Sequence, residues 1–358
     1  MCKRSMNLLL VIALAVIPVT GAAVSVTTVP PPAPTTKLRL FVHVFTVVSS
    51  DIRQGVRWPT SHEDYLANQI SSIEKAGIYE VVSAGDVKAA IGDQDITYGQ
   101  MERNDWDLAR AIGKGLHADY VMVITRKKQK GMQGIEFVFE AVMINAATGR
   151  NFKTGYTVGS VIMTDIKELA ERSRQAYRTI FSLAKEDLLA AAVKKSRAFV
   201  PQSPAPPMQP EPAAAAPIKG AGEGAKKVLV YDFDANEQYR TVAMILAEAL
   251  REELLTLKKF ALAGQDELQK VRKDAASSGM EPISGKQVVA MGKEVAADQV
   301  VTGLLGLDGE AFVVQATRTG VEAGTTLGRA SLTFKSGQEG EVMKRLPEFA
   351  KELMGLQK

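Results

Sequence analysis

Two carboxylates that could carry out phosphoryl chemistry, Asp232 and Asp234, stand directly after the apolar run 228–231. Paired aspartates after a buried strand can hold magnesium while one of them attacks a phosphoryl group. Asn236 replaces the hydroxyl expected two positions after Asp234, and no later acidic pair follows a strand. A magnesium-dependent phosphate-ester hydrolase that uses Asp232 and Asp234 is therefore the alternative function, and a turn or cap role for Asp234 is favoured.

Other stretches with a ligand-binding composition each lack a residue that their chemistry needs. The glycine-rich stretch 220–226 precedes a strand, whereas a phosphate-binding loop follows one. Asp93 and Asp95 begin like a calcium loop, but Tyr98 occupies the position that needs glycine. The three histidines lie far apart and the only cysteine is Cys2, so zinc-ligand spacing is missing. We expect no catalytic residue, no metal and no cofactor.

A run of cations, Arg126, Lys127 and Lys128, follows another apolar run. Such a run could meet phosphate, lipid headgroups or an acidic partner. A solvated turn is favoured, because the chain balances 44 basic against 40 acidic residues and the run has no interleaved aromatic residues. Together with Trp58, in the long loop 49–59, these cations are the candidate interaction residues. Nucleic acid is not an expected partner.

A phrase of ten residues occurs twice and indicates two copies of one domain. Residues 113–122 read GKGLHADYVM, and residues 292–301 read GKEVAADQVV. In both places a helical pattern passes through Ala-Asp into an apolar strand pattern. Lysine near the end of a helix and aspartate at the start of a strand can cap backbone groups and interact with the helix dipole, so their presence does not require a ligand. We therefore assign the phrase to a structural joint, with the shared residues Gly113, Ala118, Asp119, Gly292, Ala297 and Asp298.

The length of 358 residues suits two domains with extensions better than a single core. Proline-rich stretches separate the parts, because proline suppresses helix and such stretches offer little to bury. The longer stretch predicts a semi-rigid linker that lets the domains move relative to each other. The predicted boundaries are a signal peptide at 1–23, a proline-rich spacer at 24–36, a first α/β domain at 37–200, a linker at 201–225 and a second α/β domain at 226–358.

The first domain reads as strands and helices in alternation. A capping box of Thr60 and Glu63 predicts a helix to about residue 76. A helix over 105–115 and a long helix ending near Arg197 are also predicted, because apolar residues recur at helical spacing. The predicted strands and the hairpin with its turn at 145–149 follow from β-rich or alternating runs: 38–45, 79–83, 120–125 and 135–144.

The second domain repeats this order with shorter connections. Asn236 is predicted to cap a helix that follows the strand 228–233. The later hairpin is predicted to turn at Thr319 and Gly320, much as the first copy turns at 148–149. Both copies are therefore predicted to be small mixed sheets flanked by helices, in the α/β (α+β) class, with these remaining elements: strands 260–263 and 300–307, a helix over 287–295 and a final helix through residues 342–354.

The first residues have the layout of a secretory signal peptide. Lys3 and Arg4 precede the apolar run 8–19, and small residues end at Ala23. The run is shorter than the roughly 20 residues that a membrane span needs. Cleavage near Ala22 or Ala23 is expected, with an uncleaved anchor as the alternative and the only expected membrane contact. The protein is therefore predicted to be exported to the periplasm or cell envelope.

The element order resembles that of the TolB amino-terminal-like domain and its relatives in the curli secretion lipoprotein family. The residues that carry the resemblance are Phe45 and Phe233 at the ends of the first strands, the runs 118–121 and 297–300, and the turn 145–149. The resemblance implies an α/β module of the bacterial envelope that binds other proteins or assembles. Propeller repeats and a pore-forming hairpin are missing from the sequence, so neither relative's particular function is implied. The predicted function is an exported, non-enzymatic module for protein binding or assembly.

Overall fold

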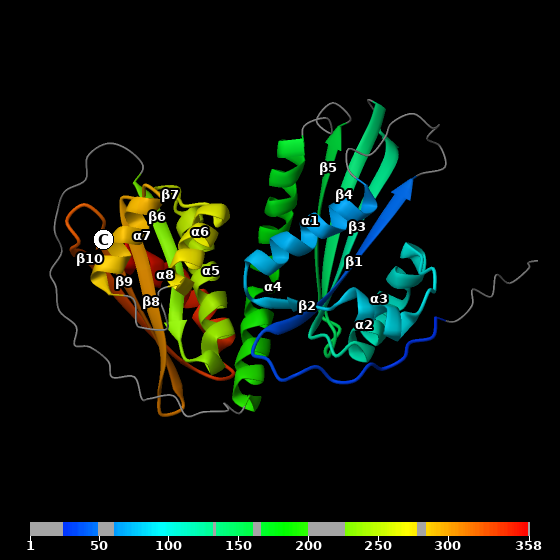
Figure 1. Cartoon of the computed structure of the whole chain (residues 1–358), viewed down its shortest axis with the longest axis horizontal. Helices are drawn as coiled ribbons and strands as arrows, with labels where there is room; N and C mark the ends of the chain where they lie inside the picture. The colour runs from blue at the N-terminus through cyan, green and yellow to red at the C-terminus, as the bar shows by residue number, and fades with distance from the viewer. Residues whose placement is uncertain are drawn as a thin grey trace, which may run out of the picture.

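The computed structural model describes residues 24–48, 61–131, 134–159, 166–199, 226–277 and 284–356. Within these residues the chain forms two five-stranded mixed sheets with flanking helices (Figure 1). The predicted fold class, two tandem α/β copies, is confirmed. Trp58, the segment 1–23 and the linker 201–225 lie outside the described residues.

The first module builds its sheet in the order β2-β1-β3-β4-β5. The strand β1 runs parallel to β2 and β3, and the remaining neighbours are antiparallel. Its elements are β1 (Leu38–Val48), α1 (His62–Lys75), β2 (Tyr79–Val81), α2 (Ala84–Ile91), α3 (Tyr98–Gly115), β3 (Tyr120–Gly131), β4 (Gly134–Asn145), β5 (Asn151–Gly159) and α4 (Ile166–Ala198).

The second module has the equivalent order, β7-β6-β8-β9-β10, with the same parallel and antiparallel pairs. Each strand and main helix thus has a counterpart in the first module. Its elements are β6 (Lys227–Ala235), the short 3-10 helix η2 (Glu237–Tyr239), α5 (Arg240–Thr256), β7 (Ala261–Leu262), α6 (Gln265–Ser277), α7 (Gly285–Glu294), β8 (Gln299–Asp308), β9 (Ala311–Gly320), β10 (Thr326–Lys335) and α8 (Glu339–Leu353).

Helix caps explain several boundaries and correct one prediction. The N-cap of α1 is Ser61, whose hydroxyl accepts from the N–H of Asp64, one residue after the predicted cap Thr60, which lies outside the described residues. Asn236 makes no side-chain cap bond, and the chain first forms η2. Capping boxes that the sequence analysis missed begin α3, at Thr97, and α7, at Ser284.

The hairpin turns of the two modules align more closely than predicted. Gly149 donates to the carbonyl of Asn145, and Gly324 donates to that of Gly320. The turn in the second module therefore follows Gly320 and does not lie at Thr319 and Gly320. Equivalent turn residues are 320 − 145 = 175 and 324 − 149 = 175 positions apart, so the turn keeps its length in both copies.

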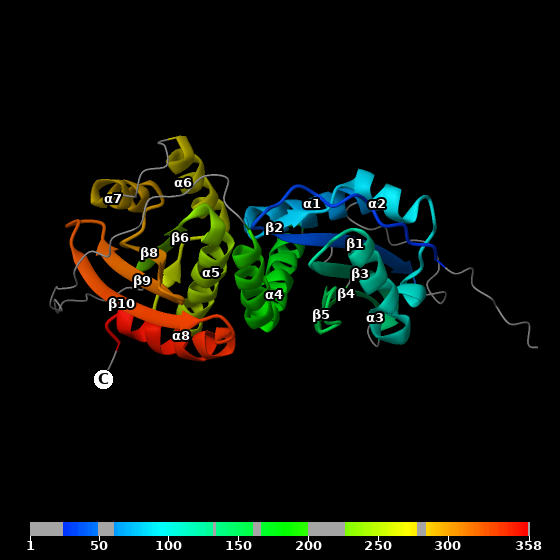
Figure 2. The same cartoon turned by 90° about the horizontal axis from the view of Figure 1, so that it is seen from below.

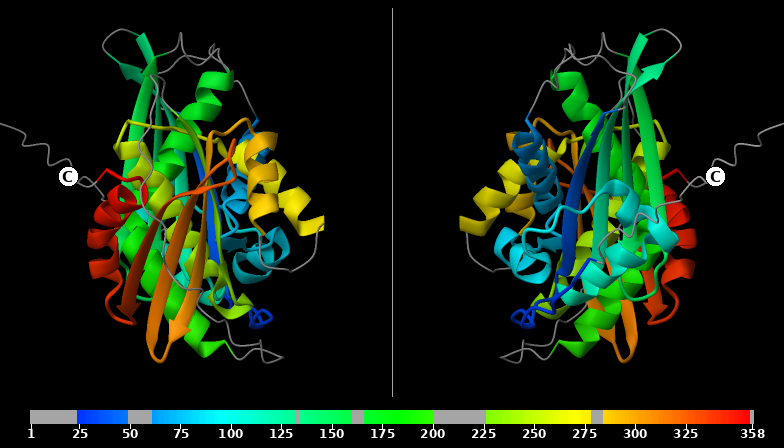
Figure 3. Two further views of the ribbon diagram at one scale, coloured as in Figure 1. Left: turned by 90° about the vertical axis from the view of Figure 1, so that its left-hand side faces the viewer. Right: turned by 90° about the vertical axis from the view of Figure 1, so that its right-hand side faces the viewer.

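Helices cover opposite faces of each sheet. In the second module, α8 lies on one face and α6 and α7 lie on the other (Figure 3). The outer faces pack against small apolar cores, built around Val121 and Trp106 in the first module and Val300 and Met291 in the second. The inner faces share one apolar cluster, which runs from residues of β1 through α4 to α5 and α8.

The long helix α4 lies between the two modules (Figure 2). Its buried stripe packs into the shared core and includes Ile180, Phe181, Ala184, Leu188, Leu189, Ala192 and Val193. This stretch of α4 is therefore an internal packing surface. In this structure the two modules bury apolar side chains against each other, so they are packed together across α4.

Residues 24–34 are here called the strap, and its first part, residues 24–29, lies against α2 and α3. The N–H of Thr27 donates to the carbonyl of Ala90 (2.8 Å), and that of Val29 donates to the carbonyl of Gly115 (2.9 Å). Val29 is buried in the outer core of the first module. The first part of the predicted spacer therefore packs on the first module.

Candidate functional site

The repeated phrase forms the same joint in both modules. In the first, the N–H of Asp119 donates to the carbonyl of Arg39 (2.8 Å), and its carboxylate accepts from the N–H of Arg39 (2.7 Å). The carbonyl of Asp119 also accepts from Ala146 (3.0 Å). Lys195 of α4 reaches the same carboxylate at 2.7 Å. Asp119 therefore ties the start of β3 to β1, to the hairpin turn and to α4.

Asp298 repeats these bonds at nearly the same lengths. Its N–H donates to the carbonyl of Lys227 (2.8 Å), its carboxylate accepts from the N–H of Lys227 (2.7 Å), and its carbonyl accepts from Val321 (2.9 Å). The residue two positions before each aspartate is left-handed, with φ of 53° at His117 and 49° at Ala296. The repeated phrase thus gives both modules the same backbone bend and the same hydrogen bonds.

The glycines of the joint allow a helix to approach the sheet. A Cβ on Gly113 would lie 2.6 Å from a methyl of Val121, and one on Gly292 would lie 2.3 Å from a methyl of Val321. Ala118 and Ala297 are buried beside these contacts, and each donates its N–H to the glycine carbonyl at 2.8 Å. Steric fit and backbone bonding therefore account for the residues that the two phrases share.

The cationic run lies in β3 and not in a solvated turn. The strand continues to Gly131, paired with β1 and β4, so neighbouring side chains alternate between the two faces of the sheet. Arg126 is 2% exposed and donates to the hydroxyl of Thr46 (2.7 Å), with its guanidinium 5.1 Å from the ring centre of Tyr65. The prediction of a solvated turn failed because β3 is longer than its apolar run.

Lys127 and Lys128 point to opposite faces. Lys127 lies 2.8 Å from Glu140 and 4.9 Å from the ring centre of Tyr98. Lys128 is buried, with its ammonium group 5.7 Å from the ring centre of Phe137. Burial lowers the pKa of both Arg126 and Lys128. The structure therefore brings the three cations to one end of the sheet but leaves Lys127 the most accessible of them.

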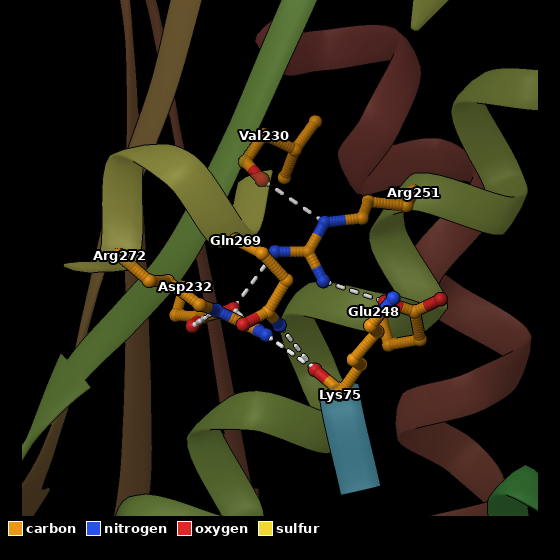
Figure 4. A network of polar contacts seen from close by, with 7 residues as sticks. All are labelled: Lys75, Val230, Asp232, Glu248, Arg251, Gln269 and Arg272. Carbon is orange, nitrogen blue, oxygen red and sulfur yellow. Dashed lines mark hydrogen bonds and ion pairs between the residues drawn. The ribbon is translucent and has the colours of Figure 1, made fainter. Parts of the chain in front are cut away.

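Asp232 lies in a network of arginines at the boundary between the modules (Figure 4). Arg251 of α5 approaches one carboxylate oxygen of Asp232 at 2.8 Å, and Arg272 of α6 donates to both. Burial opposes ionisation of the carboxyl, but these two guanidinium groups outweigh it and hold the pKa of Asp232 below its usual range. The carboxylate is thus ionised and fully engaged at neutral pH.

These contacts do not fit the nucleophile or magnesium ligand of a hydrolase. A magnesium ligand offers free carboxylate oxygens to the ion, whereas both oxygens of Asp232 accept from arginine. No group of three or more histidine, cysteine, aspartate or glutamate side chains arranged to hold a metal occurs within the described residues. The phosphate-ester chemistry considered for Asp232 and Asp234 therefore finds no support in this geometry.

The same network fastens the two modules together. Arg272 also donates to the carbonyl of Lys75 (2.7 Å), the last residue of α1, and Gln269 donates to that carbonyl as well. Gly77 lies beside this contact, where a Cβ would meet the terminal methyl of Met244 at 2.2 Å. The end of α1 therefore docks on α5 and α6 through matched polar and steric contacts.

His43 and His62 lie near each other, and His117 lies apart from them. His43 lies on β1 with its ring centre 4.4 Å from that of Phe45, and burial, with His62 nearby, lowers the pKa of His43 to about 4. His62 is 3.1 Å from the hydroxyl of Thr46, and His117 is 2.8 Å from the carbonyl of Val29. His43 is thus neutral at pH 7, and within the described residues the histidines belong to no group of three or more side chains that could hold a metal.

A small cleft between α1 and α4, over β3 and β4, was not visible in the sequence. Its volume is about 460 Å³ including the open mouth, and its lining includes Tyr65, Ile73, Met122, Phe139 and Tyr177. Polar groups of Gln69, Ser72 and Glu140 also line it. The lining residues come from four elements, so only the fold brings them together.

No helix within the described residues is both long and apolar enough to cross a membrane. No protein-family model matches the sequence, and no curated protein matches it.

Solved structures similar to this chain come from several bacteria. The carboxy-terminal domain of LpoB from Escherichia coli is 15% identical, with 31% of this chain and 83% of that chain covered and a TM-score of 0.24. TolB from Acinetobacter baumannii is 16% identical, with coverages of 37% and 29% and a TM-score of 0.24. Lipoprotein GNA1162 from Neisseria meningitidis is 13% identical, with coverages of 34% and 78% and a TM-score of 0.25. Each likeness spans about a third of this chain and carries no function to it.

Proposed function

We propose that this chain is an exported, non-enzymatic protein-binding or assembly module of the bacterial cell envelope. The carboxylates whose positions suggested chemistry are used in structural contacts, and this supports the proposal. Asp232 is held by two arginines, and Asp119 and Asp298 fasten strands. The tandem TolB-like family and the domain boundaries given above belong to the same proposal.

The observation that carries the proposal is the form of the first module, in which β3 and β4 extend beyond α1, α2 and α3 (Figure 1). We call residues 127–131 of β3 and 134–138 of β4 the arm. Gln129 and Lys130 are exposed on it, and Val48 at the end of β1, paired with Lys128, is 52% exposed. An exposed cation and an exposed apolar side chain together suit contact with another protein.

Arg126, Lys127 and Lys128 have different parts in this proposal. Arg126 and Lys128 are buried and stiffen the base of the arm, and Lys127 contributes a partly exposed charge. Trp58 stays a candidate contact residue from the sequence alone. The expected partner is an envelope protein or a second copy of the chain, with no nucleic acid.

Site-specific photo-crosslinking in intact cells tests the proposed contact. A photoreactive residue at Lys130 is expected to capture one defined envelope protein or a second copy of this chain. The matched control is Glu322, an exposed residue in the β9–β10 turn of the other module. Equal, unspecific labelling from both positions would count against the arm as a contact surface.

The export part of the proposal has a separate readout. Mass spectrometry of the protein recovered from the periplasmic fraction is expected to give a first residue near Val24. Recovery only with membranes, with the first 23 residues intact, would support the anchored alternative. Recovery in the cytoplasm would contradict export.

A further inference from the structure

The boundary between the modules holds an unbalanced set of buried charges, contributed by α4, α5, α6 and β6. Among the described residues it contains four carboxylates against three cations, and each of these side chains is less than one-fifth exposed. The carboxylates are those of Asp232, Glu248, Glu252 and Glu253, and the cations are those of Lys185, Arg251 and Arg272. One proton would make the set neutral.

The distances identify where that proton would bind. Glu253 lies 2.9 Å from Lys185, whereas Glu252 lies 4.0 Å from the same ammonium group. Glu248 is paired with Arg251 at 2.6 Å. One carboxylate oxygen of Glu252 is buried and accepts no hydrogen bond within the described structure. Glu252 is therefore the carboxylate with the weakest compensation.

We propose that Glu252 is a proton-sensitive latch between the two modules, which closes the α4–α5 contact when protonated and loosens it when ionised. The groups that face Glu252 are Lys185, Ser182 and Tyr177 on α4, and Glu248 and Glu253 on its own helix. The hydroxyl of Tyr79, on β2, lies next to that of Tyr177. Lys185 is the one cation among them, and it is already bound to Glu253.

Burial raises the pKa of Glu252 to about 7; Lys185 opposes this and Glu248 adds to it. When the modules separate, the carboxyl returns to water and to its ordinary pKa near 4.5. Between these values the closed state binds the proton and the open state does not. The closed state therefore loses stability as pH rises from about 4.5 to about 7, and the loss is complete above that.

The expected size of the effect is on the order of a hundredfold in the opening equilibrium between pH 5 and pH 8, as an upper bound. Glu252→Gln keeps the shape and removes the titration, so its opening should match that of the wild type at pH 5. At pH 8 the variant should stay closed while the wild type opens more. Glu322→Gln, on the surface, should keep the pH response of the wild type.

The full chain is suited to a fluorescence energy-transfer measurement of module separation. Lys114 and Lys293 occupy equivalent exposed positions in the two modules and can be replaced by cysteine for labelling, with the single native Cys2 replaced by serine. The latch predicts a broader, longer label separation at pH 8 than at pH 5 in the wild type and no change in Glu252→Gln. The same separation at both pH values in the wild type, or the same pH response in Glu252→Gln, would overturn it. Neither outcome depends on a binding partner, so the test is separate from the proposed function.

Discussion

Asp232 accepts hydrogen bonds from arginines of two different helices, α5 and α6, and one of those arginines reaches into the other module. Its sequence context suggested a nucleophile, whereas its neighbours make it a structural anion. The difference arises because Arg251 and Arg272 lie 19 and 40 residues away and only the fold brings them to the carboxylate. A local motif therefore could not reveal this role.

Replacing Asp232 by asparagine should destabilise the protein strongly. The change leaves Arg251 and Arg272 buried without their carboxylate, a loss of about 3–5 kcal/mol in the free energy of unfolding. Urea denaturation at pH 7 measures it. Asp266→Asn, which removes a 75% exposed partner of Lys75, is the control and should change the free energy by less than about 1 kcal/mol. Magnesium-dependent ester turnover that disappears in Asp232→Asn would instead revive the hydrolase.

The joint glycines offer a second test at the residue scale. Gly292→Ala places a methyl 2.3 Å from Val321 and 2.8 Å from Val300, so the helix must shift from the sheet. The expected loss is about 1–3 kcal/mol in the free energy of unfolding. Gly285→Ala in the same helix meets nothing within 4 Å, so it should be neutral or slightly stabilising. Equal effects of the two changes in urea denaturation would contradict the steric role.

At the scale of elements, apolar and helical patterns predicted the order of strands and helices in both modules. The pattern of Ala109 and Ile112 placed one buried helix face correctly, whereas Trp106, also buried, lies in a non-helical break of α3 with φ of 69°. Element boundaries were less predictable. The strand β3 stays paired with β4 through its polar residues as far as Gly131, so sheet pairing there outweighs the polarity of the side chains. The helix α6 was missed because it has few apolar residues and depends on contacts such as Leu268 and Val271 with the outer core.

The packing of the strap on the first module could not be predicted from its proline-rich composition. Its prolines follow the segment that docks, and the docking uses backbone bonds to Ala90 and Gly115 with Val29 as the buried side chain. Such bonds have no sequence signature. Alternation of Val24, Val26 and the buried Val29 with exposed residues was the available signal.

Charge placed in the strap should release it. Val29→Asp puts a carboxylate into the outer core and is expected to cost about 1.5–3 kcal/mol in lost burial. Limited proteolysis with mass spectrometry should then show cleavage within residues 24–36. The neighbouring Thr28 is exposed, so Thr28→Asp should leave the strap protected. Equal cleavage of both variants would show that the strap is not held by Val29.

At the scale of the whole molecule, the two copies of the domain pack against each other through the inner faces of their sheets. The helix α4 belongs to the first module by sequence order, yet its buried stripe completes the apolar cluster of both. Polar contacts also hold the two modules together: Arg272 donates to the end of α1, and Lys185 pairs with Glu253. The sequence predicted the duplication through its repeated phrase. It could not show the joining, because no local pattern records which face of a helix meets a second domain.

This arrangement leaves the arm of the first module as the proposed contact surface. We propose that the protein acts by binding other proteins in the cell envelope, and photo-crosslinking from Lys130 in intact cells is the decisive measurement. We expect one reproducible crosslinked species, an envelope protein or a second copy of the chain, that is missing when the photoreactive residue is at Glu322. No crosslinked species from Lys130, together with a purified protein that stays monomeric, would contradict it.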